Sequence, residues 1–319
     1  MTPKRIRQLS SDDSLYSRLY HCWKGLPAGA LVTVPISAYD EYERFHASML
    51  PEYERRERHE QSLVGDGDSF TTEGRCHVCR RPSTFVTDFE YAPGEMLHGK
   101  RVPNWRERLT CVHCGLCNRL RASVQFLERN LGCRHDSLIY MTEQTTPLYQ
   151  HLHGHYRHVT GSEYFGDRVP YGTNDPVTGL RNESVNKLTF ANDSFDFLLS
   201  FDVFEHVPDY TTALRECHRT LKPGGTLLFT VPFHKGYRET LLRARLRNDG
   251  SIEHLQDPEY HGDPVGAGAG CLCFHTFGWD LLPQLRDIGF ASAEAHLFWS
   301  ARHAYLGTEQ LLLTARKAH

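Results

Sequence analysis

The chain has 319 residues, of which 39% are hydrophobic and 24% are charged, as in a soluble globular protein with room for two domains. Its formal net charge of −3 at pH 7 gives no sign of a nucleic-acid or anionic-membrane binder. No apolar run approaches the roughly 18 residues that span a bilayer, and residues 1–25 lack the apolar core of a secretion signal. We therefore expect a cytoplasmic protein, whose cysteines are thiols or metal ligands rather than disulfides.

Residues 1–70 are rich in charged and aromatic side chains and are expected to form a helical arm. Two helical pieces are predicted, over 37–50 and 51–63, with Pro51 in the first turn of the second piece. We expect the arm to pack on the rest of the chain, because charge runs on helices usually mark solvated faces. A separate binding function is the alternative.

Residues 71–132 hold two cysteine pairs, which predict a small zinc ribbon. The ligands would be Cys76 and Cys79 from the first pair and Cys111 and Cys114 from the second, with 31 residues between the two pairs. Two C-x-x-C knuckles bring four thiolates to one tetrahedral ion, and such a closed site is structural rather than catalytic. Cys117 is an alternative to Cys114. Unligated core cysteines and a redox dithiol are the other interpretations.

The same segment contains basic residues that could contact nucleic acid, namely Arg119, Arg121 and the run at 99–109. The whole chain carries no excess of positive charge, so nucleic acid is not expected as a partner.

Residues 133–319 alternate between strand-like and helix-like segments, which predicts a mostly parallel sheet covered by helices. Asp209 is a favourable N-cap for one of the helices. The first four strands are expected near 137–142 and 158–165, then up to 182–184, and near 195–204. A further strand, a helix and two closing strands are expected near 225–233, 278–290, 291–298 and 308–316.

Four short motifs follow one another in the segment 188–233. They are Leu188-Thr189-Phe190, Phe195-Asp196, Glu205-His206-Val207 and Leu221-Lys222-Pro223-Gly224-Gly225. In this order and spacing they resemble the class I S-adenosylmethionine-dependent methyltransferases, in particular methyltransferase type 11-like domains. The resemblance covers about residues 137–316. It implies an α/β fold with a doubly wound, seven-stranded, mostly parallel Rossmann-like sheet whose last strand is antiparallel.

Ligands of open α/β sheets lie at the carboxyl ends of the strands, which selects the candidate cofactor residues. Glu163 follows the second strand and suits the two ribose hydroxyls of S-adenosylmethionine, because a carboxylate can accept both hydrogen bonds. Glu183 and Ser184 follow the third strand; Ser184 stands where the family has an aspartate for the adenine amine. The fourth strand ends in the remaining candidates, Ser200, Phe201 and Asp202.

The loop after the first strand, residues 142–147, contains no glycine, although the family resemblance implies a glycine-rich turn there. We predict that side chains replace the bare backbone. Thr145 offers a hydroxyl to the amino-acid end of the cofactor, and Glu143 can accept a bond from its ammonium. Pro147 begins a helix whose free N–H groups favour the cofactor carboxylate.

Methyl transfer needs alignment and exclusion of water, and a general base is optional. If a base is used, histidine is the expected type, and the candidates are His206, His234 and His261. His261 lies in a long insert at 235–276, which is predicted to be a lid or substrate-binding segment. Tyr260 and Asp263 are further candidates in it; turn residues in an idle loop are the alternative.

The sequence thus predicts an S-adenosylmethionine-dependent methyltransferase with a structural zinc ion. The expected acceptor is a small molecule or a sugar- or lipid-linked metabolite, with oxygen preferred over nitrogen as the accepting atom. One alternative is an enzyme that uses S-adenosylmethionine for another outcome. Another is a non-enzymatic zinc-ribbon binding protein with a degenerate methyltransferase scaffold. The oligomeric state is not predicted.

Overall fold

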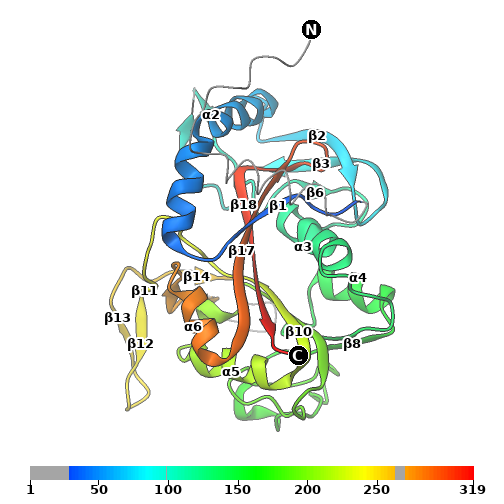
Figure 1. Cartoon of the computed structure of the whole chain (residues 1–319), viewed down its shortest axis with the longest axis vertical. Coiled ribbons are helices and arrows are strands. Elements are labelled where there is room, and N and C mark those ends of the chain that lie inside the picture. The colour runs from blue at the N-terminus through cyan, green and yellow to red at the C-terminus, as the bar shows by residue number, and fades with distance from the viewer. Residues whose placement is uncertain (1–28, 98, 263–269) are drawn as a thin grey trace.

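A computed structural model of the chain describes residues 29–97, 99–262 and 270–319 (Figure 1). The expectation about a secretion signal in residues 1–25 and the candidate Asp263 lie outside the described residues. Among the described helices, none is long and apolar enough to cross a membrane.

The central feature is a seven-stranded mixed sheet, as the fold prediction required. Its strands lie in the order β1 (Thr33–Ile36), β17 (Phe290–Ser300), β18 (Tyr305–Lys317), β10 (Leu221–Thr230), β9 (Phe195–Phe201), β7 (Leu138–Met141) and β8 (His158–Gly161). The pairs β7–β8, β7–β9 and β9–β10 are parallel, and β18 is antiparallel to both of its neighbours. The antiparallel last strand is therefore confirmed.

One predicted strand is missing from this sheet. The segment that was expected to end a strand at 182–184 makes only an isolated parallel bridge, between Glu163 and Asn182. Asn182 is fully buried, and its side chain bonds to the backbone of Phe165, Gly166 and Val169, so it fastens a loop instead of extending a ladder. The seventh place in the sheet is taken by β1, which comes from the N-terminal arm and pairs with β17.

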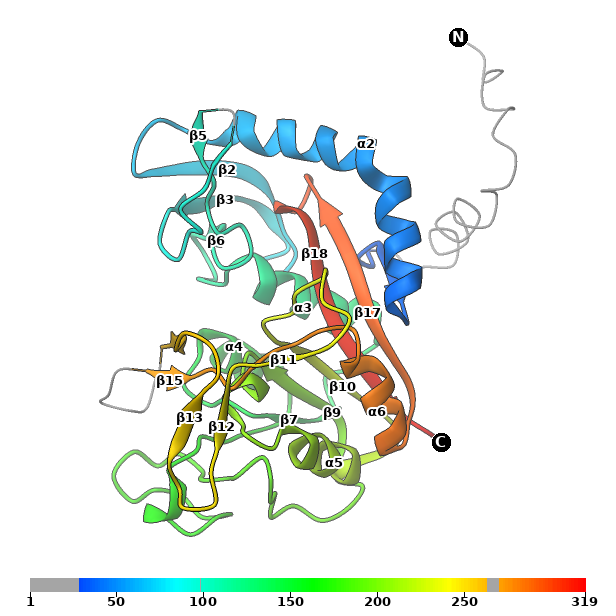
Figure 2. The same cartoon turned by 90° about the vertical axis from the view of Figure 1, so that its left-hand side faces the viewer.

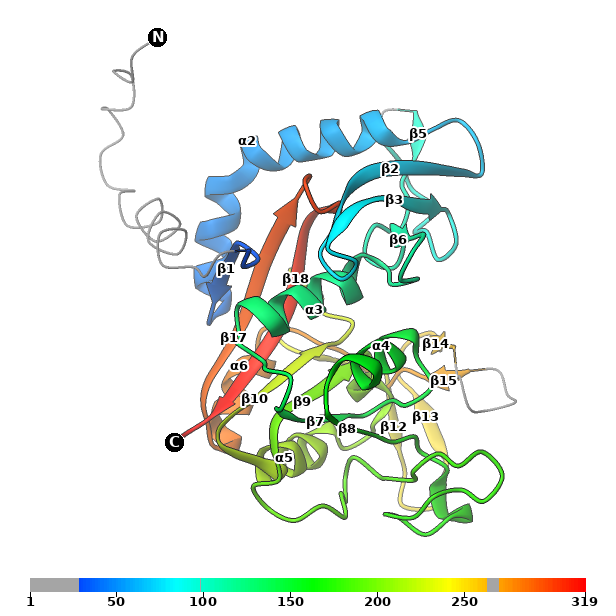
Figure 3. The same ribbon diagram turned by 90° about the vertical axis from the view of Figure 1, so that its right-hand side faces the viewer.

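Helices cover both faces of the sheet, which makes it doubly wound (Figures 2 and 3). One face packs on α5 (Tyr210–Thr220), α6 (Leu281–Ile288) and part of α2 (Tyr39–Leu63), and the other on α3 (Asn118–Arg129) and α4 (Pro147–His155). Successive residues of β9 alternate between the two cores, as the period of two requires: Leu198 belongs to the first, and Phe197 and Leu199 to the second.

Residues 39–63 form one continuous helix, so the prediction of two helical pieces over 37–50 and 51–63 is wrong. Helix α2 has 25 residues with Pro51 inside it, and Figure 2 shows that it is bent. A proline in a helix interior removes one backbone hydrogen bond and kinks the helix without always ending it. The expected packing is confirmed, because Phe45 is buried in the first core and Met49 packs against it.

The cysteine-containing segment forms a small antiparallel sheet on top of the central one (Figure 3). Its strands are β2 (Ser69–Cys76), β3 (Arg81–Asp88) and β6 (Thr110–Cys111), with a short hairpin of β4 (Met96–Leu97) and β5 (Lys100–Arg101). The Arg75 N–H donates to the Arg302 carbonyl at 2.8 Å, which joins this sheet to the turn between β17 and β18.

The insert after β10 folds into three two-stranded ladders. They pair β11 (Leu241–Leu242) with β16 (His275–Thr276), β12 (Ala244–Leu246) with β13 (Ile252–His254), and β14 (Tyr260–His261) with β15 (Cys271–Leu272). Two 3₁₀ turns complete the described elements, η1 (Gly166–Arg168) and η2 (Phe204–His206). Turn η2 directly follows β9, so it brings Glu205 and His206 to the carboxyl end of the sheet.

Candidate functional site: a strand-end pocket and a four-cysteine cluster

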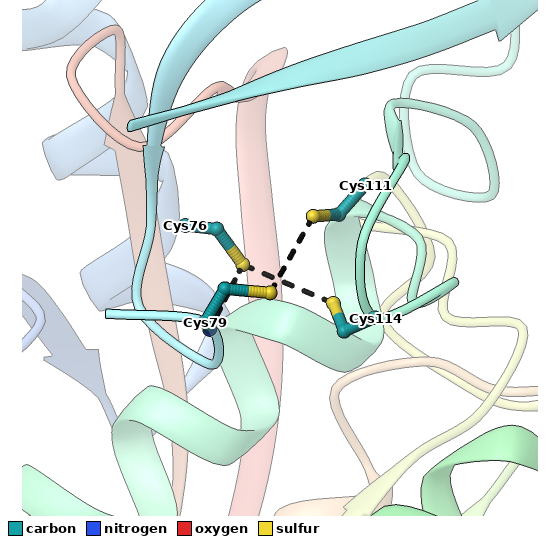
Figure 4. A group of neighbouring side chains, drawn as sticks. All are labelled: Cys76, Cys79, Cys111 and Cys114. Carbon is teal, nitrogen blue, oxygen red and sulfur yellow. Dashed lines mark hydrogen bonds between the residues drawn. The ribbon is translucent and has the colours of Figure 1, made fainter. Parts of the chain in front are cut away.

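The four predicted cysteines meet at one point between the two knuckles (Figure 4). The Sγ atoms of Cys76 and Cys114 are 3.9 Å apart, and those of Cys79 and Cys111 are 3.8 Å apart. Four thiolates around a tetrahedral zinc ion with bonds of about 2.3 Å are separated by about 3.8 Å. The geometry fits zinc, and the cluster suggests that the protein binds it. Cys117 lies outside this group, at the N-cap of α3, so Cys114 is the better assignment.

A pocket with a volume of about 1060 Å³ opens at the carboxyl ends of β7, β8, β9 and β10. Its size is that of a site for a small organic ligand or cofactor. Of the predicted cofactor residues, six line it: Glu143, Glu163, Glu183, Ser184, Phe201 and Asp202. Thr145 and Ser200 are not among its lining residues.

The glycine-free loop is held to the neighbouring strand by Glu163. One oxygen of this carboxylate, Oε1, accepts hydrogen bonds from the backbone N–H groups of Gln144 and Thr145 at 2.7 and 2.9 Å, and from the Thr145 hydroxyl at 2.9 Å. Thr146 caps α4 by accepting from the Tyr149 N–H at 3.2 Å. The loop is therefore fixed by Oε1 of a side chain that lies just after β8, and Glu163 also lines the pocket.

Besides Glu163, Glu143 is a carboxylate of the pocket wall that is available to a ligand. Burial raises the pKa of Glu143 to about 8; nearby Arg119 opposes this shift, and the negative charge of Asp202 adds to it. A positively charged ligand placed beside Glu143 would favour its ionised form.

Asp202 belongs to an ion network that joins the sheet to the cysteine-containing segment. Arg106 contacts both of its carboxylate oxygens, at 2.7 and 2.8 Å, and Arg119 lies 3.2 Å away. Arg119 also pairs with Glu107 at 2.9 Å. Although burial opposes it, the positive charges of Arg106 and Arg119 hold the pKa of Asp202 well below its usual range. The carboxylate predicted to bind cofactor is thus already paired by protein groups.

Two other predicted residues also have internal partners. Glu183 forms an ion pair with Arg181 at 2.7 Å and accepts from the Thr189 N–H at 3.0 Å. The Ser200 hydroxyl accepts from the Thr142 hydroxyl at 3.0 Å and is fully buried behind the pocket wall. Ser184 lines the pocket, as does its neighbour Glu183.

Two of the three predicted histidines reach the pocket. His206 and His261 both line it, and their rings meet edge to face with centroids 5.1 Å apart. Cys273 and Glu205 raise the pKa of His261 to about 11, which is too high for a proton acceptor at neutral pH. His234 does not line the pocket; its ring stacks on Tyr237 with a centroid distance of 3.8 Å.

Several pocket residues were not found by sequence reasoning. Tyr91, Asn104, Arg106 and Glu107 come from the cysteine-containing segment and line the pocket together with the strand ends. Arg106 lies in the basic run at 99–109, and the positive charge of this run is the only sequence feature that pointed to it. The charge of Arg106 pairs with Asp202 inside the protein.

Comparison with known proteins agrees with this arrangement. Residues 143–229 match the family described as a methyltransferase domain. Over 50 residues the chain is 40% identical to phosphoethanolamine N-methyltransferase 2 of Caenorhabditis elegans, covering 16% of this chain and 11% of that protein. Over 49 residues it is 48% identical to demethylmenaquinone methyltransferase of Bacillus velezensis, covering 15% and 21%.

A third curated relative is a ubiquinone biosynthesis O-methyltransferase of Pseudomonas syringae pv. tomato, 42% identical over 39 residues, which are 12% of this chain and 17% of that protein. The matched stretches span less than a quarter of the length of these relatives. Among solved structures, a 1,6-didemethyltoxoflavin-N1-methyltransferase of Burkholderia thailandensis aligns with a TM-score of 0.37 and 19% identity, over 63% of this chain and 78% of that one.

The family match begins in the glycine-free loop at Glu143 and ends within β10. It therefore contains the carboxyl ends of β8 and β9, which are two of the four strand ends at the pocket. With the seven-stranded doubly wound sheet and its antiparallel β18, the match identifies the chain as one that contains a class I S-adenosylmethionine-dependent methyltransferase domain.

Proposed function

We propose that this protein transfers a methyl group from S-adenosylmethionine to a small-molecule acceptor, with oxygen as the accepting atom. The observation that carries the proposal is the pocket at the carboxyl ends of β7 to β10, which is large enough for a cofactor and is walled by carboxylates. The cofactor would supply an activated methyl group on a positively charged sulfur.

The residues of the pocket fit such a cofactor. Glu163 uses Oε1 to fix the loop, so Oε2 is the oxygen proposed to accept from ribose hydroxyls. Glu143 lines the same pocket and is proposed to face the positive charge of the ligand. Thr145 is assigned a supporting role, because its N–H and hydroxyl are both bonded to Glu163. The other predicted cofactor contacts stay predictions.

The remaining walls support an organic acceptor rather than a polyanion. They include apolar and aromatic side chains from the strand ends and from the insert, among them Val207, Phe233, Tyr260, Leu272 and Phe274. A mainly apolar lining with a few polar groups is typical of sites for small molecules. The curated relatives include both an O- and an N-methyltransferase, so the accepting atom rests on the sequence-based preference for oxygen.

Two of the arginines that suggested nucleic-acid contact, Arg119 and Arg121, have partners inside the protein. Arg119 pairs with Glu107 and Asp202. Arg121 is fully buried and donates to the carbonyls of His303 and Ala304. These charges are compensated inside the protein, which leaves the small-molecule proposal as the better one.

We further propose a structural zinc ion on Cys76, Cys79, Cys111 and Cys114. Four protein thiolates leave no open position, so this ion would hold the two knuckles together. Since Arg106 and Glu107 lie in the segment between the knuckles, the ion would also support one wall of the pocket. The cytoplasmic location and the division into 1–70, 71–132 and 133–319 stay predictions.

Product analysis tests the proposed reaction. The purified chain is incubated with methyl-labelled S-adenosylmethionine and a metabolite extract, and the products are identified by mass spectrometry. We expect S-adenosylhomocysteine together with a labelled acceptor, and at least a tenfold loss of turnover in Glu163→Ala. Glu54→Ala, at an exposed position on α2, is the control and should behave as the wild type.

Two other outcomes of this experiment would favour the two alternatives to methyl transfer. Methylthioadenosine as the product would favour use of a different group of the cofactor. Failure to bind S-adenosylmethionine at millimolar concentration would favour a non-enzymatic scaffold.

A further inference from the structure

A second group of metal-binding side chains lies in the pocket wall, apart from the four cysteines. It consists of His206 on η2, His261 on β14 and Cys273 just after β15. One ligand atom from each lies within 4.8 Å of the others. The three residues are brought together by the folding of the insert onto the sheet, since His206 and His261 are 55 positions apart in the chain.

A buried carboxylate points at this group without a hydrogen-bond partner. Glu205 is fully buried, and neither of its side-chain oxygens has a partner among the described residues. Its Oε1 lies 3.6 Å from His206 Nε2 and 3.4 Å from His261 Nδ1. A carboxylate in this position is costly unless a cation compensates it; the His261 imidazolium does so in the metal-free protein, and a metal ion bound to both imidazoles would take over that role. Nitrogen and oxygen ligands of one tetrahedral zinc ion are about 3.4 Å apart, which is close to the two distances observed.

Both imidazole rings are oriented as they are in metal centres. His206 Nδ1 donates to the Leu272 carbonyl at 2.9 Å and lies 4.0 Å from Cys273 Sγ, and Nε2 faces Glu205. On the other ring, His261 Nε2 lies 3.3 Å from Glu259 Oε1, and Nδ1 faces Glu205. A metal-bound histidine typically bonds its outer nitrogen to a carbonyl or carboxylate, which fixes the inner nitrogen on the ion.

The outer carboxylate is itself held in place. Arg243 lies 3.1 Å from Glu259 Oε2, and the Cys273 N–H donates to the Glu259 carbonyl at 2.8 Å. The Phe274 N–H donates to the Glu205 carbonyl at 2.7 Å. These contacts fix the backbone around the cluster, so the two imidazoles and the thiol converge on a preformed position, with Glu205 lying against the imidazoles.

We propose that His206, His261, Cys273 and Glu205 bind one zinc ion. Two imidazoles, a thiolate and a carboxylate form a donor set that suits zinc better than magnesium or calcium, which prefer oxygen ligands alone. With four protein ligands the site is closed, and its ion fastens the insert to η2 at the end of β9. The ion thereby completes the pocket wall that His206 and His261 line.

This assignment has a consequence for the predicted catalytic histidines. A nitrogen that binds zinc has no free electron pair for a proton, so His206 and His261 are positioning residues in the metal-bound protein. The inference stands independently of methyl transfer, because metal binding can be measured without any acceptor or cofactor.

Metal content of the full-length protein tests the proposal. The protein is purified without an affinity tag that binds metals, equilibrated with zinc, dialysed against metal-free buffer and measured by plasma mass spectrometry. We expect about two zinc ions per chain in the wild type, one at each cluster. His261→Ala and Cys273→Ala should each lose about one ion, and Cys111→Ser should lose the other. His254→Ala, an exposed histidine in the same insert, should keep both.

The cobalt-loaded protein identifies which cluster has been emptied. The wild type should show thiolate-to-cobalt absorption from both clusters, and Cys273→Ala should lose only the share of the single-thiolate site. One zinc ion in the wild type, or an unchanged zinc content in a folded Cys273→Ala variant, would overturn the proposal, and the cluster would then be a hydrogen-bonded thiol and imidazole group.

Anomalous scattering at the zinc edge serves if the variants do not fold. Crystals of the zinc-equilibrated wild type should show two peaks, one among the four cysteines and one between His206 and His261. A single peak at the cysteines would overturn the second site.

Discussion

The four-cysteine cluster and the cluster of His206, His261, Cys273 and Glu205 differ in how the chain assembles them. In the first, each knuckle supplies two thiols from four consecutive residues, and the spacing alone predicts the site. In the second, η2 and the distant insert must fold onto each other before the ligands meet. The comparison teaches that local metal motifs can be read from a sequence, whereas centres built by tertiary contacts become visible only in the fold.

The largest expected effect comes from breaking the local cluster. Cys111→Ser should lower the free energy of unfolding by about 4 kcal/mol, because a structural zinc site supplies folding energy to the small segment that it closes. Urea unfolding followed by tryptophan fluorescence reports on this region, since Trp105 is buried beside the cluster. Cys133→Ser, outside both clusters, is the control. An equal stability of Cys111→Ser and wild type would show that the cysteines bind no metal.

A smaller effect is expected from the link between the cysteine-containing segment and the pocket. Arg106→Ala removes the bidentate partner of Asp202 and should cost about 2 kcal/mol; the loss is below that of a fully buried pair because Arg106 keeps 31% of its side chain exposed. A double-mutant cycle with Asp202→Asn measures the coupling. Arg55→Ala, from an exposed pair with Glu52, should cost less than about 0.5 kcal/mol. Similar losses in both variants would mean that the two regions are not coupled.

The pH dependence of cofactor binding sharpens the account of the pocket. The pKa of Glu143 is raised to about 8, so its carboxyl is mostly neutral at pH 7 and ionised at pH 9. The affinity for S-adenosylmethionine, which is positively charged at sulfur, should rise roughly tenfold over this range. S-adenosylhomocysteine, with a neutral sulfur, should show a weaker dependence, and Glu143→Gln should abolish the difference in calorimetric titrations. Parallel pH profiles for the two ligands would exclude Glu143 from contact with the charge.

The raised pKa of Glu143 also affects the stability of the ligand-free protein. Because the folded pKa of Glu143 lies above the ordinary value of 4.5, the stabilising contribution of Glu143 to the free energy of unfolding is fully present below pH 4.5. It is lost as the pH rises toward 8. Glu143→Gln should therefore stabilise the ligand-free protein more at pH 8 than at pH 5. Thermal unfolding at the two values measures this, and an equal effect at both would contradict the raised pKa.

The smallest effect is expected from the N-cap of α5, a feature that neighbouring residues alone predict. Asp209 caps α5 by accepting from the Thr212 N–H at 3.0 Å, so Asp209→Ala should cost about 1 kcal/mol. The zinc content of the Asp209→Ala variant should equal that of the wild type. Asp249→Ala, in an exposed turn of the insert, should leave the unfolding free energy nearly unchanged. A loss well above 2 kcal/mol at Asp209 would mean that it does more than cap the helix.

Much of the fold follows from local patterns. The apolar run of β9 and the N-cap Asp209 lie within one stretch, and each predicts its element from adjacent residues. The prediction of a third strand that ends at 182–184 was wrong. The conformation of Asn182 depends on its hydrogen bonds to the carbonyls of Gly166 and Val169, which form only in the folded loop. The entry of β1 into the sheet depends on β17, more than 250 positions further along the chain.

The site was predictable only in part, for the same reason. Position at a strand end selected Glu163 and Asp202, and both line the pocket. Their partners could not be deduced, because Arg106 and Asp202 are 96 positions apart and any of many arginines would suit the carboxylate. Cys273 carried no spacing signal at all, and its place beside two histidines follows from the pairing of β14 with β15.

The central claim is that a loop without glycines, fixed by Glu163, still admits the cofactor. The crystal structure of the full-length chain with S-adenosylhomocysteine tests it most directly. We predict the ligand in the strand-end pocket, with its ribose hydroxyls on Glu163 Oε2 while Oε1 keeps its bonds to Gln144 and Thr145. Crystals grown at saturating ligand with an empty pocket, or with the ligand bound elsewhere, would contradict the account.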